Sequence, residues 1–134
     1  MDTGKSALGL DGNVAAALGY PIGIIAIICL IMEKENRFVK FHALQSILLH
    51  VAFIIVAIAV WIIGIILVIV GLAASAATNS SAFGGLFSML FGLIWLAVIA
   101  GYVVGLIYAA VKAYGGIKFM LPVIGGMADK WAGN

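Results

Sequence analysis

The chain has 134 residues, of which 66% are hydrophobic and 9% are charged. About a quarter of the residues of a soluble domain are charged, so this chain has too few charges for a water-soluble surface. The composition therefore predicts an all-α integral membrane protein, with residues 1–134 forming one domain in the lipid bilayer. A net charge of +2 without a basic cluster argues against nucleic-acid binding.

Three apolar segments predict three transmembrane helices, because one helical crossing needs about 20 apolar residues. The first predicted span covers about residues 14–32, and the uncharged stretch between Lys40 and Lys112 divides into spans at about 43–72 and 86–111. The break is the small, polar stretch 73–85. Continuously apolar runs favour helices, which satisfy their own backbone in lipid, over the alternating strands of a membrane barrel.

The basic residues predict the orientation in the cell membrane. With three spans, six of the seven Lys and Arg residues share one side and only Lys5 lies on the other. Cytoplasmic segments carry the excess of basic residues. This count predicts an external N-terminus and external loop 73–85, with a cytoplasmic loop 33–42 and a short cytoplasmic tail 112–134. The second span has an interfacial amphipathic start, where Arg37 and Lys40 reach the headgroups.

A stripe of polar side chains follows at the start of the second predicted helix. Its members are His42, Gln45, Ser46 and His50. The two histidines and the serine are spaced four residues apart, so they share one helix face, with the glutamine beside it. The stripe predicts either interhelical hydrogen bonds with interfacial anchoring, or a polar track or ligand site. His50 is deeper and needs a protein partner. The candidate partners are Tyr20, Tyr102 and Tyr108.

We expect no catalytic site, no metal site and no cofactor. The two histidines stand eight residues apart, whereas ligation of one metal from one helix needs i, i+4 spacing. A haem shared with a second subunit is the alternative that stays open. Ser46 has a histidine one turn away on either side, but no orienting acid is near, so the chain is predicted not to be an enzyme. Cys29, the single cysteine, is expected to be a small buried apolar side chain.

Small residues predict helix-packing faces, since small-xxx-small patterns let helices approach closely in lipid. The residues concerned are Gly19 and Gly23 in the first span and Ala97, Gly101, Gly105 and Ala109 in the third. Whether these faces meet each other or a second copy stays open. Pro21 is expected to kink the first span and to free a carbonyl near Ala17.

Two segments carry a family resemblance. Residues 33–46 read EKENRFVKFHALQS, and the tail contains Ala113-Tyr114-Gly115-Gly116 followed by Leu121-Pro122-Val123-Ile124-Gly125. Together they resemble a widespread family of small prokaryotic membrane proteins of unknown function. That family is related to the twenty-kilodalton subunit of the chloroplast inner-envelope import translocon. The resemblance covers roughly residues 14–128 and implies a multi-pass helical membrane protein with no known enzyme activity.

The charged loop residues predict a cytoplasmic partner surface. They are Glu33, Lys34, Glu35, Arg37 and Lys40. The function that we expect is that of a non-enzymatic small membrane subunit or scaffold, which assembles with itself or with a larger membrane complex. The alternative is a small pore or transporter-like subunit, related to a translocon.

Overall fold

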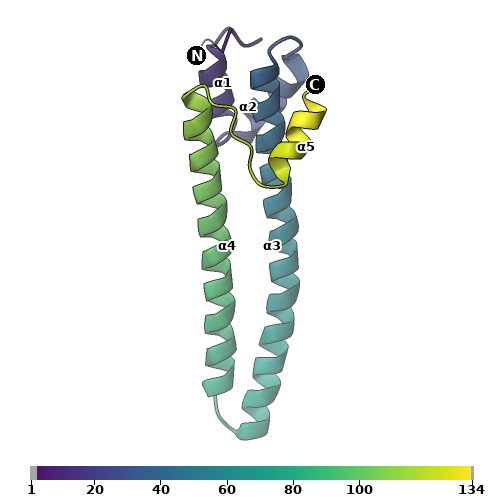
Figure 1. Ribbon diagram of the computed structural model, residues 1–134. Coiled ribbons are helices and arrows are strands. Elements are labelled where there is room, and N and C mark those ends of the chain that lie inside the picture. Colours follow the sequence, from purple (N-terminus) through teal and green to yellow (C-terminus); the bar gives the residue numbers. More distant parts are fainter. Residues whose placement is uncertain (1–2, 134) are drawn as a thin grey trace. The chain divides into compact units, whose positions relative to one another are not determined.

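The protein is helical throughout its regular structure, apart from an isolated bridge between Lys5 and Asp11, in a computed structural model that describes residues 3–133. The prediction of an all-helical protein is confirmed. The chain forms two compact units, of which unit 2 is Phe53–Tyr102 and unit 1 holds the described residues before and after it. The helices are α1 (Gly12–Leu18), α2 (Gly23–Met32), α3 (Arg37–Thr78), α4 (Ala82–Tyr114) and α5 (Ile124–Trp131) (Figure 1).

Two helices, α3 and α4, are long and apolar enough to cross a membrane. Their most apolar 18-residue windows are only 11% and 0% buried, whereas the core helix of a soluble protein is mostly buried. Both helices extend beyond the predicted spans 43–72 and 86–111. Residues 37–42 therefore belong to α3 rather than to a loop, and the connection between the helices shortens to residues 79–81.

The first apolar run forms two short helices rather than one continuous helix. α1 ends before Pro21, whose ring cannot continue an α-helix, and α2 begins two residues after it. The two helices pack against each other, with Ala15 and Ala26 in one apolar cluster. The kink expected at Pro21 is therefore a complete break in the helix.

Hydrogen bonds join the two ends of this apolar run. The backbone N–H of Ala7 donates to Glu33 Oε2 at 2.8 Å, and the side-chain amide of Asn36 donates to the carbonyl of Thr3 at 2.7 Å. A helix that crosses a bilayer separates its ends by about 30 Å. In the structure the two ends of this run instead lie together. The continuous helix predicted for the span at 14–32 is not found, and the external N-terminus stays a prediction.

The first turns of α3 lie at the centre of unit 1, with the other helices of that unit around them (Figure 1). Val39 and Ala43 pack in the cluster that α1 and α2 form, where Cys29 is buried as predicted. Phe41 packs against Ala128 of α5. α1 also contacts the last part of α4 through small side chains, which are Ala16, Ala109 and Ala113.

Unit 2 is a pair of antiparallel helical segments packed through aromatic rings. A Cβ added to Gly64 of α3 would lie 2.6 Å from Cζ of Phe91, and one added to Gly71 would lie 3.1 Å from Cβ of Phe87. The ring of Phe91 therefore leaves no room for a side chain at position 64 unless it moves, and the contact of Phe87 with Gly71 is tight. Trp61 extends this contact, with its ring edge-on to Phe91 at 6.0 Å between centroids.

Candidate functional site

Four polar side chains of unit 1 are completely buried and lie together. They are Tyr20 from the break between α1 and α2, and His42, Gln45 and Ser46 from the first turns of α3. We refer to these four residues as the polar cluster. Polar groups taken out of water need partners of their own, so the hydrogen bonds of the cluster determine what it does.

The side-chain amide of Gln45 makes three hydrogen bonds. Its Oε1 accepts from the backbone N–H of Leu121 at 3.0 Å, and its Nε2 donates to the carbonyl of Phe119 at 3.0 Å. Because one backbone group only donates and the other only accepts, the orientation of the amide is determined. The second hydrogen of Nε2 is then donated to the hydroxyl of Tyr20 at 2.7 Å.

The Tyr20 hydroxyl, which accepts from Gln45, is also hydrogen bonded to Nδ1 of His42, 3.0 Å away. The other ring nitrogen of His42 is Nε2. That nitrogen is buried and has no hydrogen-bond partner among the described residues. The backbone of Ile117 interacts with the ring.

Ser46 and His50 face the hairpin of α1 and α2. The Ser46 hydroxyl donates to the carbonyl of Gly19 at 2.7 Å, which satisfies a backbone group beside the helix break. His50 donates from Nδ1 to the Ser46 carbonyl at 2.7 Å, and its ring lies 3.5 Å from the position of a Cβ on Gly23. The small residues Gly19 and Gly23 thus give room to the polar side of α3.

The polar cluster connects three parts of the chain that are distant in sequence. Tyr20 and Gly19 belong to the apolar hairpin, Gln45 and Ser46 to α3, and Phe119 to the segment between α4 and α5. Tyr20, which the sequence suggested as a partner of His50, hydrogen bonds with His42 and Gln45. The contacts of the cluster are therefore contacts between segments, of the kind that hold helices together in a membrane.

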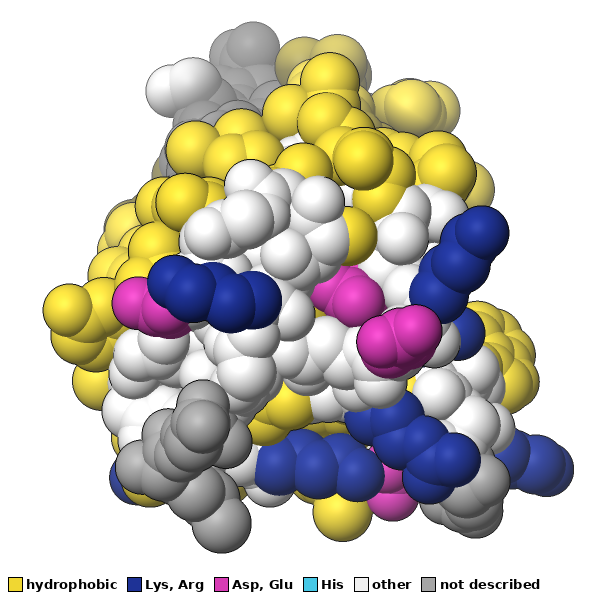
Figure 2. Space-filling model, turned by 90° about the horizontal axis from the view of Figure 1, so that it is seen from above, with side chains coloured by type: hydrophobic (Ala, Val, Ile, Leu, Met, Phe, Trp, Pro, Cys, Tyr) yellow, Lys and Arg dark blue, Asp and Glu magenta, His cyan; other side chains and the backbone are white. Residues whose placement is uncertain are grey.

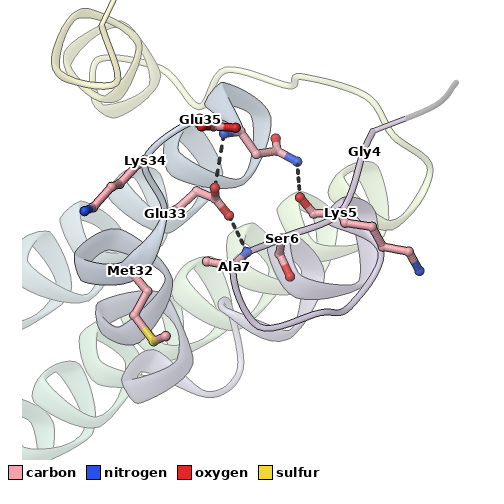
Figure 3. Close-up of a pocket in the computed structure, with 9 residues that line it drawn as sticks. Gly4, Lys5, Ser6, Ala7, Met32, Glu33, Lys34 and Glu35 are labelled. Carbon is pink, nitrogen blue, oxygen red and sulfur yellow. Dashed lines mark hydrogen bonds between the residues drawn. The ribbon is translucent and has the colours of Figure 1, made fainter.

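A second polar site lies where residues 3–7 meet residues 33–36, and we call it the clasp. The Glu33 carboxylate accepts from the backbone N–H groups of Ala7 and Asn36, and Asn36 also donates to the Lys5 carbonyl at 3.2 Å (Figure 3). The clasp lines an open pocket of about 520 Å³, and the side chain of Lys34 extends away from it (Figure 3).

Charged side chains of unit 1 gather on the face that Figure 2 shows, where Lys and Arg are interspersed with Asp and Glu. Of the residues predicted to form a partner surface, Lys34, Glu35 and Arg37 are exposed and Lys40 is half-buried. Glu33 is only 6% exposed, because its carboxylate is used in the clasp. Four of the five predicted residues are therefore accessible to a partner.

The predicted packing face of α4 has two different environments. A Cβ added to Gly101 or Gly105 would meet nothing within 4 Å, and Ala97 is exposed. Ala109, at the next position of the same spacing, is fully buried against α1. The folded chain therefore leaves the glycine part of this face open.

Within residues 3–133, no group of three or more His, Cys, Asp or Glu side chains is arranged to hold a metal ion. The stripe instead pairs with backbone carbonyls and N–H groups that the sequence pattern did not single out, at Gly19, Phe119 and Leu121. Backbone groups carry no residue-type signal. A pattern of side chains alone therefore gives no means of finding these partners.

Two apolar helices of membrane-spanning length, with buried polar side chains and one charged face, define a small helical membrane protein. The chain belongs to the UPF0132 family of membrane proteins. It is 39% identical over 132 residues to a UPF0132 membrane protein of Methanocaldococcus jannaschii, an alignment that covers 96% of each chain. It is 33% identical over 126 residues to a second such protein of that organism, which covers 93% of this chain and 73% of the relative.

A UPF0132 membrane protein of Archaeoglobus fulgidus is 36% identical over 127 residues, which are 91% of this chain and 96% of the relative. No family model and no solved structure matches the chain. The resemblance to a family of small prokaryotic membrane proteins is confirmed. The relation to the chloroplast translocon subunit stays a prediction.

Proposed function

We propose that this protein is a non-enzymatic small subunit of the cell membrane, which assembles with itself or with a larger membrane complex. The observation that carries this proposal is the open glycine face of α4, where Gly101 and Gly105 have free space around them. Small residues at such spacing let a second helix approach the backbone closely in lipid. The exposed charges beside the clasp provide a separate polar surface for a partner at the membrane boundary.

Substitution of the open glycines tests the assembly role. Gly101→Ile and Gly105→Ile add bulk without touching the fold of the chain itself, and they should weaken association by about 1–2 kcal/mol, roughly tenfold. Gly92→Ile is a matched control. Gly92 also has nothing within 4 Å of an added Cβ, but nine residues separate it from Gly101, about two and a half helical turns, so it lies on the opposite face of α4.

Native mass spectrometry of gently solubilised membranes measures the outcome. We expect the wild type and Gly92→Ile to form the same oligomer or complex, and Gly101→Ile and Gly105→Ile to shift toward the monomer. Equal oligomeric states for all four proteins would show that the glycine face contacts lipid only.

A second candidate function is a small pore or transporter-like subunit, and the buried Nε2 of His42 favours it. The His42 ring is hydrogen bonded to Tyr20, which is hydrogen bonded to Gln45. In the structure these groups have no exposed surface, so a path through them requires an opened state. Flux of ions or solutes into liposomes containing the purified protein tests this function, with His42→Leu as the variant that should abolish the flux. Wild-type liposomes that are as tight as empty ones contradict it.

A further inference from the structure

We propose that the hairpin of α1 and α2 enters the membrane from the charged face of unit 1 and returns to the same face. On this proposal only α3 and α4 cross the bilayer. The outer face of α2 is then a contact surface for the acyl chains of one lipid leaflet.

Two hydrogen-bonded connections hold the relevant segments on one side. The clasp joins residues 3–7 to residues 33–36. Asn13, at the start of α1, donates from its side-chain amide to the carbonyl of Tyr114, the last residue of α4, at 2.8 Å. The segment before the hairpin, the segment after it and the end of α4 are therefore neighbours.

The lengths of the two helices suit a hairpin that dips into the bilayer without crossing it. α1 has 7 residues and α2 has 10, which correspond to about 10 Å and 15 Å at a rise of about 1.5 Å per residue. The hydrocarbon core is about 30 Å thick. The turn at Pro21 therefore reaches roughly the middle of the bilayer.

Non-helical backbone is tolerated at that depth only where the protein satisfies it, and the turn meets this condition. Proline at position 21 has no N–H to satisfy. The N–H groups of Tyr20 and Ile22 donate to carbonyls of the last turn of α1 at 3.2 Å each. The carbonyl of Gly19 accepts from Ser46. The polar cluster thereby makes the turn compatible with a lipid environment.

The two faces of α2 differ as a lipid-facing helix requires. Ala26 and Cys29 are buried against α1 and α3. The opposite face carries large apolar side chains, of which Ile24 is 65% and Ile31 is 74% exposed, with Ile27 and Ile28 between them. This apolar face ends at Glu33, where the charged face begins. The apolar surface of α2 thus has the position and the chemistry of a surface in contact with acyl chains.

The distribution of charge agrees with this arrangement and gives its direction. All seven Lys and Arg residues lie before residue 41 or after residue 111. If only α3 and α4 cross, these seven share one side, and the connecting loop 79–81 on the other side has no charge. The positive-inside rule places the seven basic residues in the cytoplasm. Three crossings leave Lys5 on the wrong side.

Cysteine labelling in membrane vesicles tests the side on which each segment lies. In the full chain with Cys29→Ala, we would place single cysteines by Ala7→Cys, Glu35→Cys and Ser80→Cys. Ala7 contributes only its backbone N–H to the clasp, so its replacement keeps the hydrogen bond; Leu8→Cys, also at an exposed position, is a second probe of the same segment. A membrane-impermeant maleimide should label positions 7, 8 and 35 in inside-out vesicles and position 80 in right-side-out vesicles. Labelling of positions 7 and 8 from the side opposite to position 35 overturns the proposal.

Spin labels on α2 test the contact with lipid. Nitroxides at Ile24→Cys and Ile31→Cys, in the same background reconstituted into vesicles, report access to oxygen, which concentrates in the bilayer, and to a water-soluble nickel chelate. We expect oxygen access at both positions, with nickel access lower at position 24 than at position 31. High nickel access at position 24 shows a hairpin in water. Exclusion of both reagents shows a face covered by protein, such as a second copy. Either result overturns the proposed lipid contact.

Discussion

The two units of the molecule are built from parts of the same two long helices, yet different interactions hold them. In unit 1 the core contains a glutamine, a histidine and a tyrosine that are fully buried and linked by hydrogen bonds, and a buried serine that donates to a backbone carbonyl. In unit 2 rings pack onto glycines, and Phe53 stacks on Tyr102 with centroids 4.1 Å apart. The hydroxyls of Ser75 and Ser80 accept hydrogen bonds from backbone N–H groups beside the loop.

This difference shows how two problems of folding in lipid are solved. Unit 1 joins short segments and a helix break, whose backbone groups need partners, and polar side chains supply them. Unit 2 contains regular helices that satisfy their own backbones, so close packing alone holds them together. Side-chain polarity is therefore concentrated where the backbone is irregular.

Gln45→Leu should cause the largest loss of stability, because it breaks the hydrogen bonds of the polar cluster in unit 1. It leaves the N–H of Leu121, the carbonyl of Phe119 and the Tyr20 hydroxyl without this partner. Each such loss costs about 1–3 kcal/mol when the group stays buried, so we expect the free energy of unfolding to fall by at least about 2 kcal/mol. The reaction of buried Cys29 with a thiol-specific fluorophore during heating measures this effect.

Thr78→Val is the control for that experiment, because Thr78 is exposed and its hydroxyl bonds only to its own helix. Its effect should stay within about 0.5 kcal/mol. If Gln45→Leu exposes Cys29 at the same temperature as Thr78→Val does, the polar cluster does not stabilise unit 1.

Gly64→Ala should cause the next largest loss of stability, and this loss should be in unit 2. The new methyl group would lie 2.6 Å from Cζ and 2.7 Å from Cδ2 of Phe91, so the ring has to move. Overpacking of this kind costs about 1–3 kcal/mol. Fluorescence of Trp61 and Trp95 in a Trp131→Phe background reports on this unit, since both tryptophans lie within it.

Gly92→Ala is the matched control, because an added Cβ there meets nothing within 4 Å. It should be neutral or stabilise the helix by up to about 1 kcal/mol. Combining Gly64→Ala with Phe91→Leu should cost less than the sum of the two single changes, since the smaller side chain makes room for the methyl group. Equal effects of Gly64→Ala and Gly92→Ala contradict the proposed close packing.

Ser46→Ala should have the smallest effect of the three. It removes one hydrogen bond, to the Gly19 carbonyl, and should cost about 1 kcal/mol. Because that carbonyl lies at the turn of the hairpin, the change should also raise hydrogen exchange at Tyr20 and Ile22 more than in α4. A uniform increase along the chain would contradict a local role for this bond.

The composition and the spacing of the charges by themselves determined the class of this protein and the place of its two long helices, whose ends lie within six residues of the predicted spans. They did so because an uncharged apolar run of this length has few stable alternatives to a helix in lipid. The four-residue spacing likewise placed His42 and Ser46 on one helix face. These properties depend on the local periodicity of the sequence and on the free energy of transfer of side chains between water and lipid. Both follow from the type and order of the residues.

Other properties depended on contacts that only the tertiary structure shows. The apolar run at 14–32 is compatible with one continuous helix and with a hairpin of two short helices. The hydrogen bonds of Glu33 and Asn36, which join the two ends of the run, show that it forms a hairpin. A glycine pattern likewise indicates where another helix can approach closely, but it does not identify that helix. The pattern at Gly101 and Gly105 is open in the folded chain, whereas Gly64, which belongs to no such pattern, is covered by a phenylalanine ring.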